Sequence, residues 1–255
     1  MKLATWNVNS LSVRMPRVLE FLELHAPDVL LMQETKSEPD AFPAGALEGA
    51  GYEAVHHSAG RWAGVAVAAR AGMGIADVRA GLAGEPAADE ARWLEATVGG
   101  MRVVSVYVPN GREVGSPFYE DKLRFLEAAA DRVGTLAEGP LAVGGDFNVC
   151  PTDLDVYDPA AFAGATHVTA AERERFAALL DAGVIDAYRS LEPGEPGFTW
   201  WDYRQGHFHR KLGLRIDAVL LSPPLAAGLR SAGIDRNFRK GPKPSDHAPL
   251  LAELA

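Results

Sequence analysis

The chain contains a single cysteine, Cys150, among its 255 residues. One thiol cannot form an internal disulfide, and such sparse cysteine is typical of a reducing compartment. No apolar run approaches the roughly 20 residues that a membrane-spanning helix needs. The sequence also reaches polar Asn7 too early to form the apolar core of a signal peptide. We therefore expect a cytoplasmic protein with no membrane partner.

Several catalytic motifs are missing as well. The sequence has no Walker phosphate loop, and Gly72-Met73-Gly74 is too short to be a dinucleotide-binding motif. It has no Gly-x-Ser-x-Gly elbow, and no histidine adjoins Cys150 in sequence, which disfavours a serine or cysteine nucleophile. Basic residues are outnumbered, since 25 Lys and Arg face 34 Asp and Glu for a net charge of -9. This balance argues against a polyanionic partner unless the basic residues share one face.

The basic residues do gather late in the chain. Residues 202–215 carry four Lys or Arg against one acid, and residues 230–243 carry five against one. The acidic residues lie mostly earlier, for example in residues 85–95. We expect a local basic face in the C-terminal third, although a solvated run of charges would give the same pattern.

With 47% hydrophobic residues, the chain can bury the core of one large domain or two small ones. Apolar periodicity predicts helices over residues 16–25, 119–136 and 169–181, and a short one over 223–229. Strands outnumber helices, and many are adjacent, which favours a mixed pair of sheets over a doubly wound parallel sheet. Because no linker or repeat divides the chain, we expect one domain over residues 1–255. After a first strand closed by residues 5–7, further strands are expected over residues 29–32, 52–57, 64–69, 93–98, 101–109, 141–143, 198–203, 215–221 and 248–254.

Six short polar clusters follow apolar runs, at points where buried strands would end. Acids, amides, a phenol and a histidine recur in them. In an α/β scaffold such positions form sites, because strand ends fix side chains while the following loops leave room for a ligand. In chain order the clusters are Trp6-Asn7-Val8-Asn9, Gln33-Glu34-Thr35-Lys36, Tyr107-Val108-Pro109-Asn110, Gly145-Asp146-Phe147-Asn148, Arg215-Ile216-Asp217 and Ser245-Asp246-His247.

The chemistry of these clusters indicates metal-assisted hydrolysis. In an extended segment Asp146 and Asn148 point to the same side, so both would face one pocket. Taken alone, Glu34 could instead form a salt bridge or cap a helix. Together with the other clusters, its carboxylate is expected to face the same pocket as the side chains of Asp146 and Asn148. Hard oxygen ligands without clustered histidine or cysteine suit Mg²⁺ or Mn²⁺ rather than zinc. His247 needs an orienting partner, for which Asp217 is suited, and activated water is the natural attacker.

Taken together, the motifs resemble the exonuclease III family of abasic-site endonucleases, within the DNase I-like endonuclease/exonuclease/phosphatase superfamily. The resemblance runs nearly end to end. It implies a four-layer αββα sandwich, in which two mixed β-sheets pack face to face with helices outside. The motifs that carry it are Thr5-Trp6-Asn7-Val8-Asn9-Ser10-Leu11, Leu31-Met32-Gln33-Glu34-Thr35-Lys36, Val106-Tyr107-Val108-Pro109-Asn110-Gly111, Gly144-Gly145-Asp146-Phe147-Asn148, Thr199-Trp200-Trp201-Asp202-Tyr203-Arg204, Leu214-Arg215-Ile216-Asp217 and Ser245-Asp246-His247-Ala248-Pro249.

The resemblance also implies how the metal and the water are handled. Glu34 would be the principal metal ligand, and Asn7 would complete the site. Asp146 would orient or deprotonate the attacking water, or protonate the leaving oxygen. Asn148 would position that water or the phosphate.

The remaining residues of the shared set would handle the phosphate. Tyr107 would contact it or assist the leaving group, and His247 paired with Asp217 would bind the scissile phosphate. Asp246 would support His247 or hold a second metal ion. Asn110 would bind phosphate beside the lesion.

Substrate choice would depend on the aromatic and basic stretch over residues 198–215. There Trp201, Tyr203 and Arg204 are expected to contact DNA, although strand alternation would bury at least one of the paired tryptophans. This chain departs from the family pattern at Ser12, where family members often carry arginine, and Arg14 is expected to cover that contact with the DNA backbone. Lys36 is a further expected DNA contact. An abasic nucleotide has no base to unstack, so turning it outward costs less than the usual few kcal/mol.

These observations predict a monomeric, Mg²⁺-dependent DNA repair nuclease in which Mn²⁺ substitutes for Mg²⁺. It would cut duplex DNA 5′ to abasic sites and leave a 3′-hydroxyl. It would also degrade duplex DNA from 3′ ends and remove 3′-phosphates. The alternatives are a phosphatase or phosphodiesterase for a small molecule or lipid headgroup, and a DNA-binding relative without catalysis.

Overall fold

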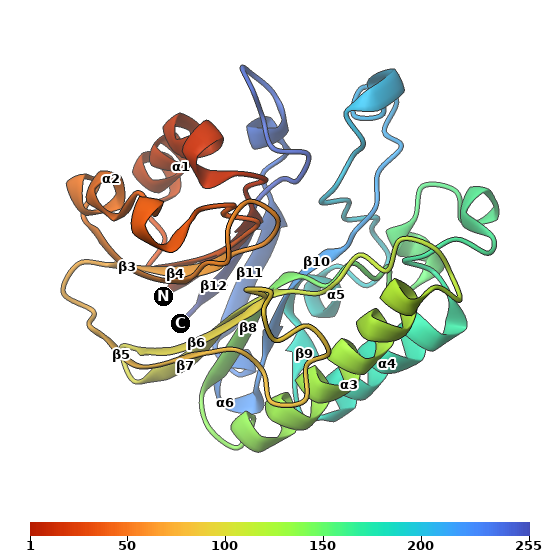
Figure 1. Ribbon diagram of the computed structural model, residues 1–255. Coiled ribbons are helices and arrows are strands. Elements are labelled where there is room, and N and C mark those ends of the chain that lie inside the picture. The colour runs from red at the N-terminus through yellow and green to blue at the C-terminus, as the bar shows by residue number, and fades with distance from the viewer.

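Two six-stranded β-sheets lie face to face in the computed structural model, which describes residues 1–255 (Figure 1). Both sheets are mixed, because β1 pairs with β2 and β7 with β8 in parallel while the other pairings are antiparallel. The first sheet has the order β11-β12-β1-β2-β4-β3, with β1 Lys2–Asn7, β2 Val29–Gln33, β3 Tyr52–His57, β4 Val65–Arg70, β11 Leu229–Ile234 and β12 Leu250–Leu254. The second has the order β5-β6-β7-β8-β10-β9, with β5 Ile75–Ala80, β6 Trp93–Val98, β7 Met101–Tyr107, β8 Leu141–Asp146, β9 Ile185–Asp186 and β10 Asp217–Leu221.

The inner faces of the two sheets share one apolar core of 19 buried residues, drawn from both sheets. The sheets come close together at Gly144 of β8. A Cβ atom there would lie 2.6 Å from Leu31 Cδ1 of β2 and 3.2 Å from Thr5 Cβ of β1. A side chain at this position would force the Leu31 and Thr5 side chains of the opposite sheet to move, so glycine lets the strand that ends in Asp146 lie close to β1, which ends in Asn7, and to β2, which leads into Glu34.

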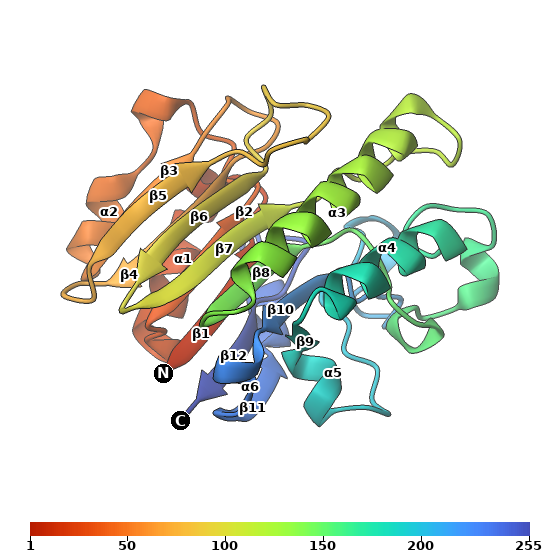
Figure 2. The ribbon, with the colours of Figure 1, turned by 90° about the horizontal axis from the view of Figure 1, so that it is seen from below.

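Helices cover the outer faces of both sheets (Figures 1 and 2). On the first sheet lie α1 Leu11–His25 and α2 Ala44–Gly49, and on the second lie α3 Pro117–Leu136 and α4 Ala170–Asp181. Separate apolar clusters of 15 and 18 buried residues fill these two helix–sheet layers. The predicted αββα sandwich is therefore confirmed. The short helices are α5 Ala187–Leu191, α6 Pro223–Ala226 and the 3₁₀ turns η1 Pro39–Ala41, η2 Asp153–Asp155, η3 Pro159–Phe162, η4 Arg204–Gly206 and η5 Arg236–Arg239.

Local sequence signals set the helix ends. The hydroxyl of Thr169 accepts a hydrogen bond from Glu172 N, and the Glu172 carboxylate accepts one from Thr169 N, which is the capping box expected at this site. Ser116 caps α3, and Pro117 occupies its first turn. The predicted helices over residues 119–136 and 169–181 are both present.

Several strands differ from the sequence prediction. Residues 198–203 form no strand, and Trp200 makes only isolated bridges to Leu214 and His247. The strands β5 and β11 were not predicted, because they lie at sheet edges, where most of their side chains are exposed or half-buried and no continuous apolar run is needed. The two-residue β9 is too short to leave a pattern.

The parallel strand pairs bring the polar clusters to one end of the sandwich. Asn7 is the register partner of Gln33 at the ends of β1 and β2, and Tyr107 is the partner of Asp146 at the ends of β7 and β8. Antiparallel β10 begins at the same edge, with Asp217 opposite Asp146. No helix combines the length and apolarity that crossing a membrane requires.

Candidate active site

A pocket of about 180 Å³ opens where these strand ends meet. Five of the six polar clusters contribute a side chain to its wall, and residues from two other segments complete it. The lining residues are Glu34, Tyr107, Asn110, Asp146, Asn148, His167, Trp200, Ile216, Asp246 and His247.

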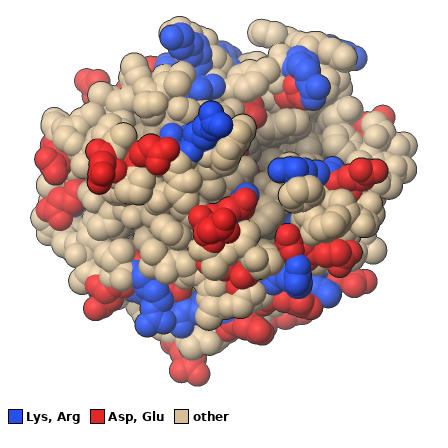
Figure 3. All heavy atoms as spheres, viewed as in Figure 1, with Lys and Arg blue, Asp and Glu red and all other residues tan.

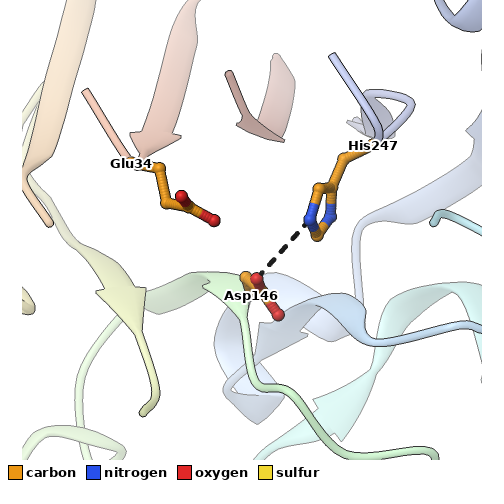
Figure 4. A group of neighbouring side chains, drawn as sticks. All are labelled: Glu34, Asp146 and His247. Carbon is orange, nitrogen blue, oxygen red and sulfur yellow. Dashed lines mark ion pairs between the residues drawn. The ribbon is translucent and has the colours of Figure 1, made fainter. Parts of the chain in front are cut away.

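Glu34, Asp146 and His247 form a tight group within the pocket. Each offers one ligand atom, and these atoms all lie within 4.8 Å of one another. Figure 4 shows the three side chains pointing toward one another, with Glu34 just beyond β2 of the first sheet and Asp146 at the end of β8 in the second sheet. The site is thus assembled across the interface between the two sheets.

His247 is held by two carboxylates. Its Nδ1 lies 2.8 Å from Asp217 Oδ2, and its Nε2 lies 3.7 Å from Asp146 Oδ2. Burial alone would lower the pKa of the imidazole, but the charges of Asp217 and Asp146 outweigh that effect and raise it to about 10. At neutral pH the ring is therefore a cation whose remaining N–H faces the pocket.

The Asp146 carboxyl has an unusually high pKa. Burial raises it to about 8, the nearby charges of Asp217 and Glu34 reinforce this, and His247 opposes it. Asp146 Oδ1 accepts a hydrogen bond from Asn148 N at 2.9 Å, which orients the carboxyl group. A group that changes charge near neutral pH is suited to proton transfer.

Asn7 lies between the two carboxylates of the group. Its Nδ2 donates to Glu34 Oε1 at 2.8 Å and to Asp146 Oδ2 at 3.0 Å. On the other side, Lys36 Nζ lies 2.8 Å from Glu34 Oε2 and donates to Asn9 Oδ1 at 2.6 Å. Lys36 therefore places a positive charge directly on the edge of the acidic group.

The donor set fits a hard divalent cation. Glu34 and Asp146 supply carboxylate oxygens, which are the ligands that Mg²⁺ and Mn²⁺ prefer. A protonated His247 has no free lone pair on its ring, so it is better suited to bind a phosphate oxygen than a metal. Asp246 lines the same pocket, but its oxygens already accept hydrogen bonds from Asn9 Nδ2 at 2.9 Å and Trp200 Nε1 at 3.0 Å.

The amide and phenol side chains of Tyr107, Asn110 and Asn148 line the same pocket. Burial, together with the charges of Glu34 and Asp146, raises the pKa of Tyr107 well above its ordinary value, so the phenol stays protonated. Asn110 Nδ2 donates to Asn148 Oδ1 at 3.4 Å. A neutral phenol and two amides therefore share the pocket with the acidic group.

Asp146 and Asn148 share the pocket as expected, although not through extended backbone. Asn148 has a φ of 52°, in the left-handed region. Its Nδ2 donates to Val108 O at 2.9 Å, and Phe147 between them packs into the core with 1% of its surface exposed. The turn after β8, and not the alternation of an extended strand, therefore directs Asp146 and Asn148 into the same pocket.

Two projecting loops stand beside the pocket, one around η4 and the other between η5 and Ser245 (Figure 1). Tyr203 OH donates to Pro244 O at 2.8 Å and accepts a hydrogen bond from Arg14 Nη2 at 2.9 Å, which links the loops to α1. The Arg204 side chain is 83% exposed and pairs with Asp202. Figure 3 shows Lys and Arg side chains on both projecting loops, beside a hollowed surface.

Trp201 and Arg215 were both predicted on this face and are buried instead, which corrects the sequence interpretation. Trp201 has none of its surface exposed and packs edge-on against Phe208, with ring centres 5.1 Å apart, so it cannot contact DNA. Arg215 is 1% exposed and forms ion pairs with Asp155 and Asp186, each at 2.6 Å. The irregular backbone at residues 200–201 turns Trp200, and not Trp201, toward the pocket.

His167 is a pocket residue that the sequence interpretation missed. Its Nδ1 lies 2.5 Å from Asn148 O and its Nε2 lies 3.5 Å from Asn110 Nδ2. Burial and the charge of Lys122 lower its pKa to about 4, so the ring is neutral. It follows no buried strand and belongs to no polar cluster, so no local pattern in the sequence marks it.

The fold and this site define a class of protein. A metal-dependent phosphoester hydrolase needs groups that bind a metal ion, bind phosphate and transfer a proton. This site provides them as paired carboxylates, an aspartate–histidine pair, a phenol and two amides, all at one end of two packed mixed sheets. A model of the endonuclease/exonuclease/phosphatase family matches residues 4–247. The chain belongs to that family and, within it, to the exonuclease III group of AP endonucleases, which are nucleases.

The relatives cover the chain from end to end. It is 32% identical to the exodeoxyribonuclease III of Haemophilus influenzae over 100% of both chains, and 30% identical to the DNA repair nuclease APEX1 of Danio rerio over 100% of this chain and 82% of that one. Among solved structures, it superposes on the 3′ phosphatase NExo from Neisseria bound to a product DNA hairpin, with a TM-score of 0.97, 41% identity and coverage of 100% and 99%. It also superposes on an AP endonuclease from Archaeoglobus fulgidus, with a TM-score of 0.95, 35% identity and the same coverage.

Proposed function

We propose that the protein is a Mg²⁺-dependent DNA repair nuclease. It cuts the backbone 5′ to abasic sites, removes nucleotides from 3′ ends of duplex DNA and removes 3′-phosphates. The observation that carries this proposal is the meeting of Glu34, Asp146 and His247 in one pocket, beside the projecting loops with basic side chains. Relatives bearing the names exodeoxyribonuclease III, 3′ phosphatase and AP endonuclease support it.

One chemical step would serve all three activities. In each, water attacks phosphorus, the bond between phosphorus and the 3′-oxygen breaks, and that oxygen takes a proton to become a 3′-hydroxyl. A single arrangement of catalytic groups therefore suffices, and the substrates differ only in what is attached to the phosphate. This common outcome explains why one pocket of about 180 Å³ could act on an internal site and on a strand end.

The metal would bind on the carboxylate side of the pocket. Glu34 would be its principal ligand, with Asp146 facing it and with Asn7 and Asp246 completing the surroundings. When bound, Mg²⁺ would neutralise phosphate charge and polarise the phosphoryl group, and Mn²⁺ would substitute for it.

The chain's own residues would hold the phosphate and move the proton. The His247 imidazolium, kept cationic by Asp217, would bind a non-bridging phosphate oxygen, and the Tyr107 hydroxyl would donate to another. Asn148 would position the water or the phosphate. Asp146, whose pKa lies near 8, would transfer the proton, either from the water or to the leaving oxygen.

Contacts with DNA would spread from the pocket over the surrounding surface. Arg14, Tyr203 and Arg204 lie on the projecting side, and Lys36 lies at the acidic edge. Asn110 would bind the phosphate beside the lesion. A local basic surface of this kind can bind a polyanion although the net charge is -9.

A direct assay tests the proposal against its alternatives. We expect the purified protein to cut a duplex with one abasic site and to release phosphate from a duplex with a 3′-phosphate. EDTA should stop both reactions, and added Mg²⁺ should restore them. Turnover of inositol phosphates or sphingomyelin with no action on either duplex would favour the small-molecule or lipid alternative.

The third alternative, a DNA-binding relative without catalysis, needs a separate comparison. We expect Asp146→Asn and His247→Ala to lose turnover and to retain most of the DNA affinity. A wild-type protein that binds DNA but is as inactive as these variants would support the non-catalytic alternative.

A further inference from the structure

Lys122 of α3 and Glu172 of α4 form an ion pair in which neither side chain has any exposed surface. Such a pair is a weak source of stability, because both charges lose their hydration when they are buried. The location of the pair suggests a different role. The pair lies directly behind the Asn110, Asn148 and His167 wall of the pocket, and its remaining hydrogen bonds hold the backbone of that wall.

The Lys122 ammonium bridges two loops of the site. Its Nζ donates to Asn148 O at 2.6 Å, in the turn after β8, and to Asn110 O at 3.3 Å, in the turn after β7. With Glu172 as the third acceptor, all three N–H bonds of the ammonium are used. One buried cation therefore sets the spacing between the backbones that present the two asparagine side chains.

The Glu172 carboxylate holds a third loop in the same way. Its Oε1 accepts from His167 N at 2.9 Å as well as from Lys122, and its Oε2 accepts from Thr169 N at 3.0 Å and Thr169 Oγ1 at 2.8 Å. His167 Nδ1 in turn lies 2.5 Å from Asn148 O, an oxygen that also accepts from Lys122. The three loops thus converge on one ion pair.

The backbone at these positions needs such restraint. Asn148 has a φ of 52° and His167 a φ of 77°, both in the left-handed region that non-glycine residues rarely occupy. Between the loops, Gly111 has a φ of 86°, and a Cβ there would lie 2.9 Å from Lys122 Cδ. The lysine stem therefore fills the space beside the turn while its ammonium ties down the carbonyl groups.

We propose that Lys122 and Glu172 are positioning residues that fix Asn110, Asn148 and His167 as one rigid wall of the pocket. Because Asn110, Asn148 and His167 line the pocket, the pair sets the shape of the wall against which an internal abasic site and a 3′-phosphate end must both fit, and so how the enzyme discriminates between them. Lys122 and Glu172 do not touch the substrate. The proposal rests on the proposed function for its choice of substrates, and on the hydrogen bonds alone for its structural part.

The test replaces the pair and measures a ratio. Lys122→Met removes the ammonium, and the double variant Lys122→Met/Glu172→Gln avoids leaving a lone buried carboxylate. For each variant, kcat/KM is measured on an abasic duplex and on a 3′-phosphate duplex. The ratio of the two values does not depend on the fraction of folded enzyme, so partial unfolding cannot change it. We expect the ratio to change by about tenfold or more.

A second ion pair on the same helix, with only its carboxylate fully buried, gives the control. Arg132 Nε and Nη2 bind Glu95 Oε1 and Oε2 of β6, both at 2.7 Å, away from the pocket. We expect Arg132→Met/Glu95→Gln to lower thermal stability and to leave the ratio unchanged. If Lys122→Met and the double variant both fail to fold, Glu172→Gln alone carries the test, since it keeps the Lys122 ammonium that binds Asn148 O and Asn110 O and weakens the carboxylate that holds His167 and Thr169.

A measurement without turnover separates this proposal from the proposed function. Nitrogen-15 NMR should show the His167 ring of the wild type as a single tautomer with the proton on Nδ1, and a mixture of tautomers in Lys122→Met. An unchanged ratio together with an unchanged tautomer in folded variants would overturn the positioning role. A wild type that is inert on every DNA substrate would instead overturn the proposed function, and the tautomer would still report on the positioning.

Discussion

His247 Nδ1 lies 2.8 Å from Asp217 Oδ2, and both side chains are almost fully buried. The relationship fixes the charge of the imidazole, because the neighbouring carboxylates raise its pKa to about 10 against the burial that would lower it. A histidine whose pKa is raised in the folded state stabilises the fold below its unfolded pKa, near 6.5. That contribution is lost as the pH rises through about 10.

The first prediction removes this partner. Asp217→Asn keeps a side chain of similar shape but removes the charge, so the pKa of His247 should fall and the ring should lose its proton at lower pH. We expect kcat/KM at neutral pH to fall by about a hundredfold, since the cation that would bind phosphate is weakened. NMR titration of the metal-free protein measures the shift of the His247 pKa directly.

Asp235→Asn provides the control for that experiment. His25 Nε2 and Asp235 Oδ2 form a pair of the same length, 2.8 Å, but between α1 and the loop before η5, outside the pocket. Its loss should leave the activity profile unchanged. An Asp217→Asn enzyme whose activity and His247 titration both match the wild type would show that the pairing has no functional effect.

The second prediction concerns protons released when metal binds. Burial, reinforced by Asp217 and Glu34, raises the pKa of Asp146 to about 8, so the carboxyl is mostly protonated at pH 7. A divalent cation beside it favours the carboxylate, so Mg²⁺ binding at pH 7 should release about one proton. Calorimetry in two buffers of different ionisation enthalpy counts it. Asp146→Asn should release none, and an equal release from both proteins would contradict the assignment of the proton to Asp146.

The sequence predicted the layers and the polar strand ends because those features have local causes. Buried apolar runs mark β2 and β8, and the capping box at Thr169 and Glu172 marks the start of α4. Parallel pairing of neighbouring strands then places Asn7 beside Gln33 and Tyr107 beside Asp146 without further information.

Features that depend on distant contacts could not be predicted in this way. Trp200 and Trp201 are adjacent and chemically alike, and only an irregular turn held by Leu214 and His247 decides which of them reaches the pocket. His167 reaches the pocket because Glu172, five residues later, holds its backbone N–H and Asn148, 19 residues earlier, holds its ring; the second of these contacts joins segments that no sequence pattern connects. Arg215 was expected on the basic surface but is buried, because it pairs with Asp155 and Asp186, which lie far from it in sequence.

The third prediction tests the corrected role of Trp201. Its side chain is fully buried, so Trp201→Ala should destabilise the fold by about 3–5 kcal/mol, as loss of a large core aromatic does. Trp62 is the matched control, because 72% of its surface is exposed and Trp62→Ala should change the free energy of unfolding by less than about 0.5 kcal/mol. Urea unfolding of both variants measures the difference. Equal stability of the two would contradict the burial of Trp201.

The fourth prediction concerns the salt dependence of DNA binding. Arg204 lies on a projecting loop with 83% of its side chain exposed, where it could reach a phosphate group. If it makes one phosphate contact, Arg204→Ala should reduce the slope of log K against log salt by about 0.9 and weaken binding to all sequences alike. The measurement uses fluorescence anisotropy of a labelled duplex in EDTA, so that no cutting occurs.

Arg70 is the control for this experiment. It is 46% exposed and ends β4 at the opposite end of the strands from the pocket. Arg70→Ala should therefore leave the slope unchanged. Equal slopes for wild type and Arg204→Ala would place the phosphate contacts elsewhere on the surface, whereas a reduced slope with an unchanged Arg70 variant would locate DNA on the side of the projecting loops.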